Sequence, residues 1–442
     1  MKKSLKYLSA VVLIALVCLG IWAFMVYCEG EDPAILLNRD VIMIGQKTTF
    51  DITAIDKKSG IRNVYVDISQ DGKKHTVNAL NLPEKGINRE TLNVNIVPED
   101  LGLHDGTATF GISVTDYSLR KNTTTSEFEV VVDTVPPRIS PLSFSNYINP
   151  GGSCVVTYRL SEEVSRSGVE VNSTFFPSYT ENTAGGTRNI SYFAIPVDAS
   201  NKNLAIRILA EDNAGNSSLY PVSFHIRDKQ FRRDKMNISQ RFLEIKMPEF
   251  QQMYKYLREI SLLEAFSRIN TEIREQNLKT IETICENTHP EQLWEGSFLR
   301  MKNAATMATF GDRRTYYYEG KEISKSVHMG VDLASTKNAP VEASNAGIVV
   351  FTGYLGIYGN TIIIDHGMGT FSLYAHLSSI DVQKEQTVGK GEMIGHTGNT
   401  GMAGGDHLHF SMLAGGKFVN PLEWWDPHWM NDNITEKLAV SQ

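Results

Sequence analysis

The sequence Asp406-His-Leu-His-Phe-Ser-Met412 alternates polar and apolar side chains, which is the pattern of a β-strand with one face in a core. Successive side chains of a strand point to opposite faces. His407 and His409 should therefore share one face, while Leu408 and Phe410 share the other. Two imidazoles that converge on one cavity indicate metal binding or proton transfer, so this stretch predicts both a local fold and a place for chemistry.

Histidines gather around this strand. Seven of the chain's eleven histidines lie between His328 and His428. In Ser326-Val-His-Met-Gly-Val-Asp332 an imidazole and a carboxylate stand four residues apart, and both are good zinc ligands. Gly330 between them permits a tight backbone path that lets the two side chains converge. Taken alone, this spacing is common, and a surface His beside a surface Asp explains it as well.

A third segment, Leu373-Tyr-Ala-His376, lies near the end of a predicted strand. Residues 362–365 and 371–376 read as an antiparallel hairpin around a turn at 366–369. His366 in that turn is expected to be structural, with local hydrogen bonds. His396 and His428 are also left out of the predicted site.

Together, these segments resemble peptidase family M23, the LytM or lysostaphin-type endopeptidases. Flanking sequence carries the same resemblance, in the following stretches: Phe310-Gly-Asp-Arg-Arg314, Gly347-Ile-Val-Val350, Tyr358-Gly-Asn-Thr-Ile362, Val388-Gly-Lys-Gly-Glu-Met-Ile-Gly395, Thr397-Gly-Asn-Thr-Gly401 and Val419-Asn-Pro421. The resemblance implies an antiparallel β peptidase domain. Its substrate class would be the stem or bridge peptides that cross-link bacterial peptidoglycan.

Carried over position by position, the family pattern makes His328, Asp332 and His409 the ligands of one Zn²⁺ ion. His376 and His407 become the catalytic pair, and which of them acts as the base stays open. Three protein ligands leave a fourth position for water, as in catalytic zinc sites. All five residues are present.

Three other functions are alternatives to hydrolysis of wall peptides. A non-catalytic LytM-type activator of a separate cell-wall amidase is the main alternative, although such proteins usually lack some zinc ligands. A small-molecule hydrolase and a pure adhesin account for the histidines less well. Asp406, where many relatives of the family have proline, is the one noted departure, and its consequence is open.

The N-terminus predicts a membrane segment. Three lysines precede an uncharged apolar run from Tyr7 to Cys28, and roughly 20 apolar residues suffice for a helix to span a bilayer. The basic flank should stay in the cytoplasm and the rest should be periplasmic or extracellular, anchored in the inner membrane. A cleaved signal peptide and lipid attachment at Cys18 are the alternatives.

Between the membrane segment and the peptidase-like region, residues 30–228 alternate with period two in many short runs, as in β-sandwiches. Ile112-Ser-Val-Thr-Asp116 is echoed by Ile208-Leu-Ala-Glu-Asp212, and Pro136-Pro137 marks a junction between the copies. The two copies resemble bacterial immunoglobulin-like modules. They would serve as spacers or bind wall glycan or a protein partner.

From about Phe231 to Arg300 the pattern changes to helix. Pro248 is expected in a first helical turn, followed by an apolar stripe from Met253 to Leu263 and a second stripe from Ile273 to Ile284. A connector packed on a neighbouring domain is the preferred interpretation. A pairing surface for a second copy or for a regulatory protein is the alternative, and the segment could also cover the active-site groove.

The predicted architecture is therefore multidomain and mainly β. Its parts are a basic stub and transmembrane anchor (1–28), two immunoglobulin-like β-sandwiches (29–133 and 134–228), a helical connector (229–300), an M23-type zinc peptidase domain (301–429) and a tail (430–442). The net charge of −7 and the isoelectric point near 5.9 argue against a nucleic-acid partner. Cys154 is expected to be a buried apolar side chain, with a Cys154–Cys285 disulfide as the alternative.

Overall fold

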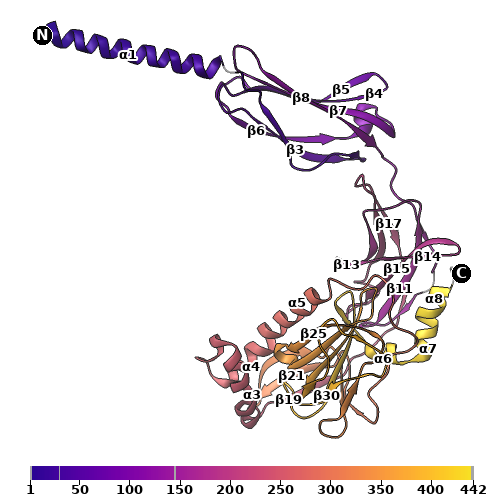
Figure 1. Ribbon diagram of the computed structural model, residues 1–442. Coiled ribbons are helices and arrows are strands. Elements are labelled where there is room, and N and C mark those ends of the chain that lie inside the picture. Colours follow the sequence, from indigo (N-terminus) through magenta and orange to yellow (C-terminus); the bar gives the residue numbers. More distant parts are fainter. Residues whose placement is uncertain (1, 29, 144–145, 440–442) are drawn as a thin grey trace. The chain divides into compact units, whose positions relative to one another are not determined.

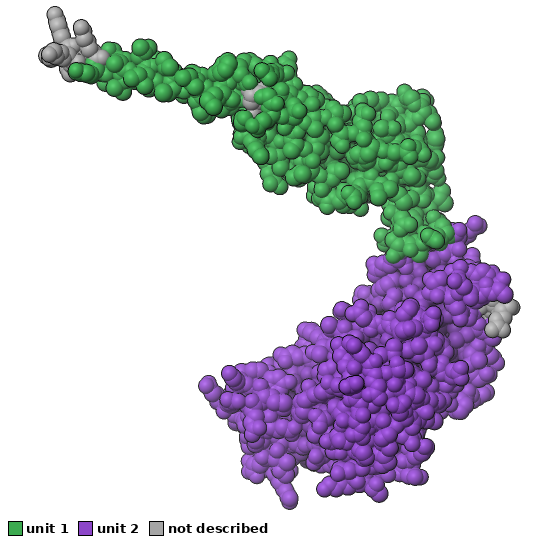
Figure 2. Space-filling model, in the orientation of Figure 1, with its two compact units in different colours: residues 1–137, 162–165, 211–218 green, residues 138–161, 166–210, 219–442 purple. Residues whose placement is uncertain are grey.

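The computed structural model describes every residue except 1, 29, 144–145 and 440–442, so the first residue of the first predicted sandwich and the end of the predicted tail lie outside the described residues. The chain forms two compact units (Figure 2). Unit 1 comprises residues 1–137, 162–165 and 211–218, and unit 2 comprises 138–161, 166–210 and 219–442. The fold is multidomain and mainly β, as the sequence predicts.

Helix α1 (Lys2–Tyr27) begins unit 1. Its part from Tyr7 to Tyr27 has a mean hydropathy of 2.7, so it is long and apolar enough to cross a membrane. A signal sequence meets the same criterion. The apolar helix is thus confirmed, while its retention and its orientation stay predictions.

The rest of unit 1 contains two sheets around one core (Figure 1). Their strand orders are β1-β3-β6 and β2-β8-β7-β4-β5. The predicted alternation is confirmed, because Phe50, Ile52, Val64, Phe110 and Ile112 are all buried in this core. The element bounds are β1 Ala34–Leu37, β2 Met43–Ile44, β3 Thr48–Ile55, β4 Ile61–Gln70, β5 Lys73–Asn81, β6 Arg89–Ile96, α2 Pro98–Leu101, β7 Gly106–Asp116 and β8 Thr123–Val132.

A second set of short strands follows, in the orders β14-β15-β11-β9, β13-β12-β16-β17 and β10-β18. Cys154 on β11 is a buried free thiol and so is Cys285, which excludes the alternative disulfide. The likeness of either strand set to immunoglobulin modules stays a prediction. The bounds are β9 Ile139–Pro141, β10 Tyr147–Ile148, β11 Ser153–Leu160, β12 Arg166–Val171, β13 Thr174–Pro177, β14 Tyr179–Thr183, β15 Gly186–Ala194, β16 Ile206–Glu211, β17 Ser217–Pro221 and β18 His225–Ile226.

The region predicted to be helical begins with a strand, β19 (Arg233–Asn237), which pairs in parallel with β21 (Arg313–Tyr318). The helices after it are α3 (Gln240–Met253), the 3-10 turn η1 (Lys255–Leu257), α4 (Leu262–Arg268), the π-helix η2 (Ile269–Ile273) and α5 (Arg274–Ile284). The second predicted stripe is confirmed at Ile273 and Ile281, which are both fully buried.

Two details of the helical prediction are wrong. Pro248 lies inside α3 rather than in its first turn, because Ser239 caps the helix and its hydroxyl accepts a hydrogen bond from the Phe242 amide. The first apolar stripe does not form one helix either. The backbone is extended at Tyr254, so that Met253 is 43% exposed, and a new cap at Ser261 starts α4.

The C-terminal domain is built on a large antiparallel sheet with the order β20-β23-β31-β27-β26-β25-β29, in which β32 pairs with β31. The predicted hairpin is confirmed, since β26 pairs with β27. The bounds are β20 Ala305–Ala308, β21 Arg313–Tyr318, β22 Lys321–Val327, β23 Val331–Ala334, β24 Pro340–Glu342, β25 Gly347–Tyr354, η3 Gly356–Tyr358, β26 Asn360–Asp365, β27 Thr370–Leu377, β28 Ser379–Ile380, β29 Thr387–Val388, β30 Met393–His396, β31 Leu408–Ala414, β32 Lys417–Val419, α6 Pro421–Trp425, α7 Pro427–Met430, η4 Asn431–Thr435 and α8 Glu436–Ala439.

Within unit 2, the second strand set packs directly on this domain. The buried carboxylate of Glu423 accepts hydrogen bonds from the Ser153 amide at 2.9 Å and from the Asn149 side chain at 2.7 Å. The indole of Trp424 donates to the Ser153 hydroxyl at 3.0 Å. Buried polar groups joined in this way resist separation, because each would lose its partner. Where the module boundaries fall along the chain stays a prediction.

Candidate active site

Strand β31 lies between β23 and β27, and this order brings the predicted site residues together. Asp332 on β23 and Ala375 on β27 are both register partners of His409. His407 comes just before β31 and His376 just after Ala375. The period-two prediction is confirmed, because His407 and His409 both approach the Asp332 Oδ1 atom, at 3.6 and 2.9 Å.

Three ligand atoms form a compact triangle. His328 Nε2 lies 2.9 Å from Asp332 Oδ1 and 3.0 Å from His409 Nδ1, and the remaining side between Asp332 Oδ1 and His409 Nδ1 is 2.9 Å. The three side chains are between 6 and 13% exposed. They are the residues that the sequence assigns to the metal.

The tautomer of His328 follows from its outer contact. Its Nδ1 lies 3.0 Å from the Thr309 carbonyl oxygen, which can only accept a hydrogen bond. Nδ1 therefore carries the proton and Nε2 presents a lone pair to the triangle.

A hydrogen bond also orients His409, but here Nε2 carries the proton and Nδ1 faces the triangle. The hydroxyl of Ser411 donates to the Met329 carbonyl at 2.9 Å, so it is free to accept from His409 Nε2 at 3.0 Å. Nδ1 of His409 is then the lone-pair nitrogen. Both imidazoles and the Asp332 carboxylate thus direct unprotonated acceptor atoms at one point, here called the ligand point. No proton lies between these atoms, and such an arrangement is favourable only when a cation occupies the ligand point.

Gly330 serves this packing in a way that the sequence did not suggest. A Cβ atom at this position would lie 2.5 Å from His409 Nε2 and 2.6 Å from the Phe410 carbonyl. The glycine is therefore needed for the close approach of β31, and its backbone angle φ is not positive. The predicted reason for Gly330, a tight backbone path, is therefore wrong, and the glycine is needed for space rather than for chain conformation.

Arg314 is a further site residue, which the sequence marks only as the last residue of the Phe310–Arg314 motif. Its guanidinium donates to Asp332 Oδ2 at 3.1 Å and is 19% exposed. It occupies the carboxylate oxygen that faces away from the triangle and leaves Oδ1 to the ligand point. Its place in the Phe310–Arg314 stretch was the available signal, but the contact joins strands that the sequence could not pair.

His376 and His407 face each other beside the triangle, with ring centroids 4.8 Å apart. His376 Nδ1 donates to the Thr400 carbonyl at 2.9 Å, and His407 Nδ1 donates to the Gly405 carbonyl at 2.9 Å. Nε2 of each ring is therefore the atom with a lone pair when the ring is neutral. Two such nitrogens beside a cation site can accept or return a proton.

The backbone at His376 is strained. Its φ is 64°, in the left-handed region that residues with side chains rarely adopt. The Thr400 carbonyl accepts from the ring, and the adjacent Asn399 carbonyl accepts from the buried ammonium of Lys246 on α3. The helical segment thus helps to hold the loop that orients His376.

Burial and local charge separate the ionisation of these groups. Burial alone would raise the pKa of the Asp332 carboxyl, but the close imidazoles of His328, His407 and His409 outweigh it and hold that pKa well below its usual range. Burial lowers the pKa of His409 to about 4. These are the ionisation states that a metal ligand set needs.

The catalytic pair differs in the same respect. Burial, followed by the neighbouring His407 and His409, holds the pKa of His376 well below its usual value. Burial opposes the charged form of His407 too, yet the Asp332 carboxylate outweighs it and raises the pKa of that ring. His376 is therefore kept neutral, whereas the protonated, positively charged form of His407 is favoured.

The remaining histidines of the region lie apart from this cluster. The buried ring of His366 is 2.7 Å from the Ala346 carbonyl and 2.7 Å from the Ser372 hydroxyl, which confirms its predicted structural role. His396 contacts Asp381 and His428 contacts Asp432.

Comparison with known proteins places this region in a described family. A model of peptidase family M23 matches residues 326–421. Over 96 residues the chain is 44% identical to the DD-carboxypeptidase/endopeptidase Mpg of Neisseria meningitidis, which covers 22% of each protein. Over 112 residues it is 38% identical to the murein hydrolase activator NlpD of Escherichia coli, covering 24% of this chain and 29% of NlpD.

One match among solved structures is as follows. The catalytic domain of the antimicrobial peptidase lysostaphin from Staphylococcus simulans is 26% identical, with a TM-score of 0.25, and the match covers 30% of this chain and 98% of that domain. The chain spans less than a third of the length of the curated relatives named above.

Proposed function

Because residues 326–421 form a peptidase family M23 domain, we propose that the chain is a zinc-dependent endopeptidase that hydrolyses peptide cross-links of bacterial peptidoglycan. The observation that supports this most directly is the triangle of three unprotonated acceptors. Two neutral imidazoles and one carboxylate suit Zn²⁺, and both imidazoles are held in the required tautomer by Thr309 and Ser411.

In this proposal His328, Asp332 and His409 hold the zinc ion. When bound, zinc would polarise the scissile carbonyl and lower the pKa of a water molecule toward about 7. The neutral Nε2 of His376 accepts the proton of the attacking water. His407, whose pKa is raised, supplies a proton toward the leaving amine and stabilises negative charge on the carbonyl oxygen.

The N-terminal helix extends the proposal to location. Its length and hydropathy suit a single-pass anchor in the inner membrane with the N-terminus in the cytoplasm. The catalytic domain would then act on stem-peptide cross-links in the periplasm. The two strand sets and the helical segment are proposed to space the domain from the membrane and to offer a surface to a regulatory protein.

A non-catalytic activator role is the second candidate, since NlpD is described as a murein hydrolase activator. The complete histidine and aspartate set favours catalysis. An activator would have no need for two further histidines beside the ligand triangle, each tethered to a backbone carbonyl.

The test uses the full chain purified in detergent micelles. Bound zinc is measured by elemental analysis, and isolated peptidoglycan is digested with and without a chelator, with the products identified by mass spectrometry. Near-stoichiometric zinc and chelator-sensitive loss of cross-linked fragments are expected. Zinc without any product would favour the activator, and absence of zinc would remove the basis of the proposed site.

A further inference from the structure

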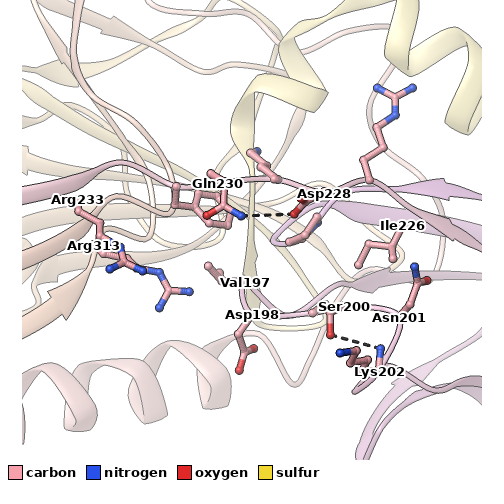
Figure 3. Close-up of a pocket in the computed structure, with 15 residues that line it drawn as sticks. Val197, Asp198, Ser200, Asn201, Lys202, Ile226, Asp228, Gln230, Arg233 and Arg313 are labelled. Carbon is pink, nitrogen blue, oxygen red and sulfur yellow. Dashed lines mark hydrogen bonds between the residues drawn. The ribbon is translucent and has the colours of Figure 1, made fainter.

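Unit 2 contains a pocket of about 690 Å³ that lies apart from the histidine cluster. Its walls come from the loop 197–202, the segment 226–231, and the first residues of β19 and β21. Pro150, Val197, Ala199, Ile226 and Phe231 contribute apolar surface, and the rest of the lining is polar or charged (Figure 3). The volume is large enough for several linked residues of a ligand rather than for one small ion.

The lining is cationic although the chain as a whole carries a net charge of −7. The cationic side chains that line the pocket are Lys202, Arg227, Lys229, Arg233 and Arg313, and the acidic ones are Asp198 and Asp228. A concave surface lined mainly by one sign of charge concentrates ligands of the opposite sign.

Two arginines form the strongest part of this charge. Arg233 on β19 and Arg313 on β21 are register partners in a parallel pair, so their side chains leave the sheet side by side on the same face, about 4.8 Å apart at the backbone. Figure 3 shows the two guanidiniums next to each other at one side of the pocket, with Lys202 at the opposite side. Like charges on neighbouring strands destabilise a sheet unless something neutralises them.

The two arginines that neighbour this pair in sequence are neutralised by carboxylates. Arg232 pairs with Asp234 at 2.6 Å, and Arg314 pairs with Asp332 at 3.1 Å. Among the residues that the structure describes, Arg233 and Arg313 have no carboxylate within 4 Å. Paired guanidiniums of this kind match the two oxygens of a carboxylate.

The pocket is linked to the metal-binding segment but opens on the other face of β21. Side chains alternate along a strand, so Arg314 reaches Asp332 while Arg313 lines the pocket. Phe231, a pocket residue, packs against Gly311, whose amide donates to the His328 carbonyl at 2.8 Å. A molecule bound in the pocket would therefore lie behind the triangle of His328, Asp332 and His409. The part bound there could not contain the peptide bond that is cut.

We propose that this pocket is a second peptide-binding site, which takes a carboxylate-bearing segment of the wall polymer away from the bond that is hydrolysed. The two arginines receive its carboxylate, the apolar wall receives its side chains, and Asp198 or Asp228 receives an ammonium group. The mixed lining favours a peptide over a phosphate polymer, because the two aspartates match an ammonium group, which a peptide carries and a phosphate polymer lacks. The assignment of the ligand to wall peptide rests on the proposed function.

The test is direct binding by the full chain in micelles. The probe is a fluorescein-labelled tetrapeptide from uncross-linked peptidoglycan, which contains no cross-link to hydrolyse, and the readout is fluorescence anisotropy. The double variant Arg233→Gln/Arg313→Gln is expected to bind at least about tenfold more weakly, since charge-assisted hydrogen bonds are lost. Its KM for cross-linked fragments should rise in parallel while kcat stays unchanged.

Arg232→Gln is the matched control. It removes one positive charge at the position next to Arg233, and Arg232 is already paired with Asp234. It should bind the probe as the unaltered chain does, and the carboxamide analogue of the probe should bind poorly to both. Equal binding by the double variant would overturn the proposal. Binding of polyphosphate in place of the peptide would overturn it too, by identifying a phosphate polymer as the ligand.

The two proposals fail in different ways. If the chain cuts cross-links but the double variant keeps its affinity and KM, only the pocket assignment is lost. If the chain cuts nothing yet binds the tetrapeptide through the two arginines, only the proposed hydrolysis is lost.

Discussion

The Ser411 hydroxyl lies 3.0 Å from Nε2 of His409 and can accept its hydrogen, because it donates its own hydrogen to the Met329 carbonyl. This contact sets which nitrogen of His409 faces the ligand point. Loss of such outer partners typically lowers metal affinity between about 10-fold and 100-fold.

Ser411→Ala should therefore weaken zinc binding by that range, measured by competition with a fluorescent chelator. Ser411→Thr keeps the hydroxyl and should retain more of the affinity than the alanine variant. Equal affinities for Ser411→Ala and the unaltered chain would show that the hydroxyl does not select the tautomer.

The ligand and catalytic roles should separate in two histidine variants. His328→Ala removes a triangle atom and is expected to abolish stoichiometric zinc. His407→Ala leaves all three ligand atoms and should keep zinc but lose turnover by at least about 100-fold. His428→Ala, in an 86% exposed side chain far from the cluster, is the control. Retained hydrolysis by His407→Ala would remove its assigned role.

Lys246 on α3 is expected to act on turnover from a distance, since its ammonium holds the Asn399 carbonyl next to the Thr400 carbonyl that orients His376. Lys246→Met should lower kcat roughly tenfold through misplacement of the ring, with zinc content unchanged. Lys255→Met, at an exposed position of the same segment, should leave kcat unchanged. A loss of zinc together with kcat would indicate general destabilisation instead.

Gly330→Ala should disrupt the triangle, because the new Cβ would meet His409 Nε2 at 2.5 Å. Overpacking of this kind costs about 1–3 kcal/mol of stability, and zinc affinity should fall with it. Gly404→Ala is the matched control, because a Cβ atom at that position would contact nothing within 4 Å. Thermal unfolding and zinc content measured on both variants decide whether close approach is the reason for the glycine.

The buried His366 should make stability depend on pH. Burial lowers its pKa to about 4, whereas an unfolded histidine titrates near 6.5. Below about pH 6.5 the unfolded state takes up a proton that the folded state refuses, so this residue's contribution is present at neutral pH and falls as the pH drops toward about 4. Between pH 7 and pH 5 the loss is about 2 kcal/mol.

Urea unfolding at the two pH values, followed by tryptophan fluorescence, measures this loss. Trp294 is a suitable reporter because its ring packs on Phe298, which contacts His366. In His366→Gln, the loss of unfolding free energy between pH 7 and pH 5 should be smaller by about 2 kcal/mol. In His428→Gln this loss should not change. The same slope in both variants would assign the pH dependence to other groups.

Local patterns predicted much of the fold. Period-two alternation identified β4 and β7 in unit 1 and β31 in the C-terminal domain, and the hairpin that carries His376 followed from its turn residues. The helical region was predicted less well. Its first strand, β19, reads as polar sequence and forms because β21 offers it a partner. The helices begin where Ser239 and Ser261 cap them, and a pattern of apolar residues does not reveal such caps.

The same limit applies to the candidate site. All five predicted residues converge, because strand register follows from which face is apolar. The contacts that tune them come from residues distant in sequence. Thr309 and Arg314 precede the ligands, Ser411 selects a tautomer, and Lys246 reaches the loop beside His376 from a helix more than a hundred residues away.

By itself the sequence determined which residue types could bind zinc and which of them share a strand face, because these depend on side-chain chemistry and backbone period alone. Only the tertiary structure decided which nitrogen each histidine presents and which of the two catalytic rings is kept neutral. It also decided that two arginines, 80 residues apart in the chain, meet in one pocket. Hydrogen-bond partners, desolvation and neighbouring charges arise from contacts between distant segments, so no local pattern encodes them.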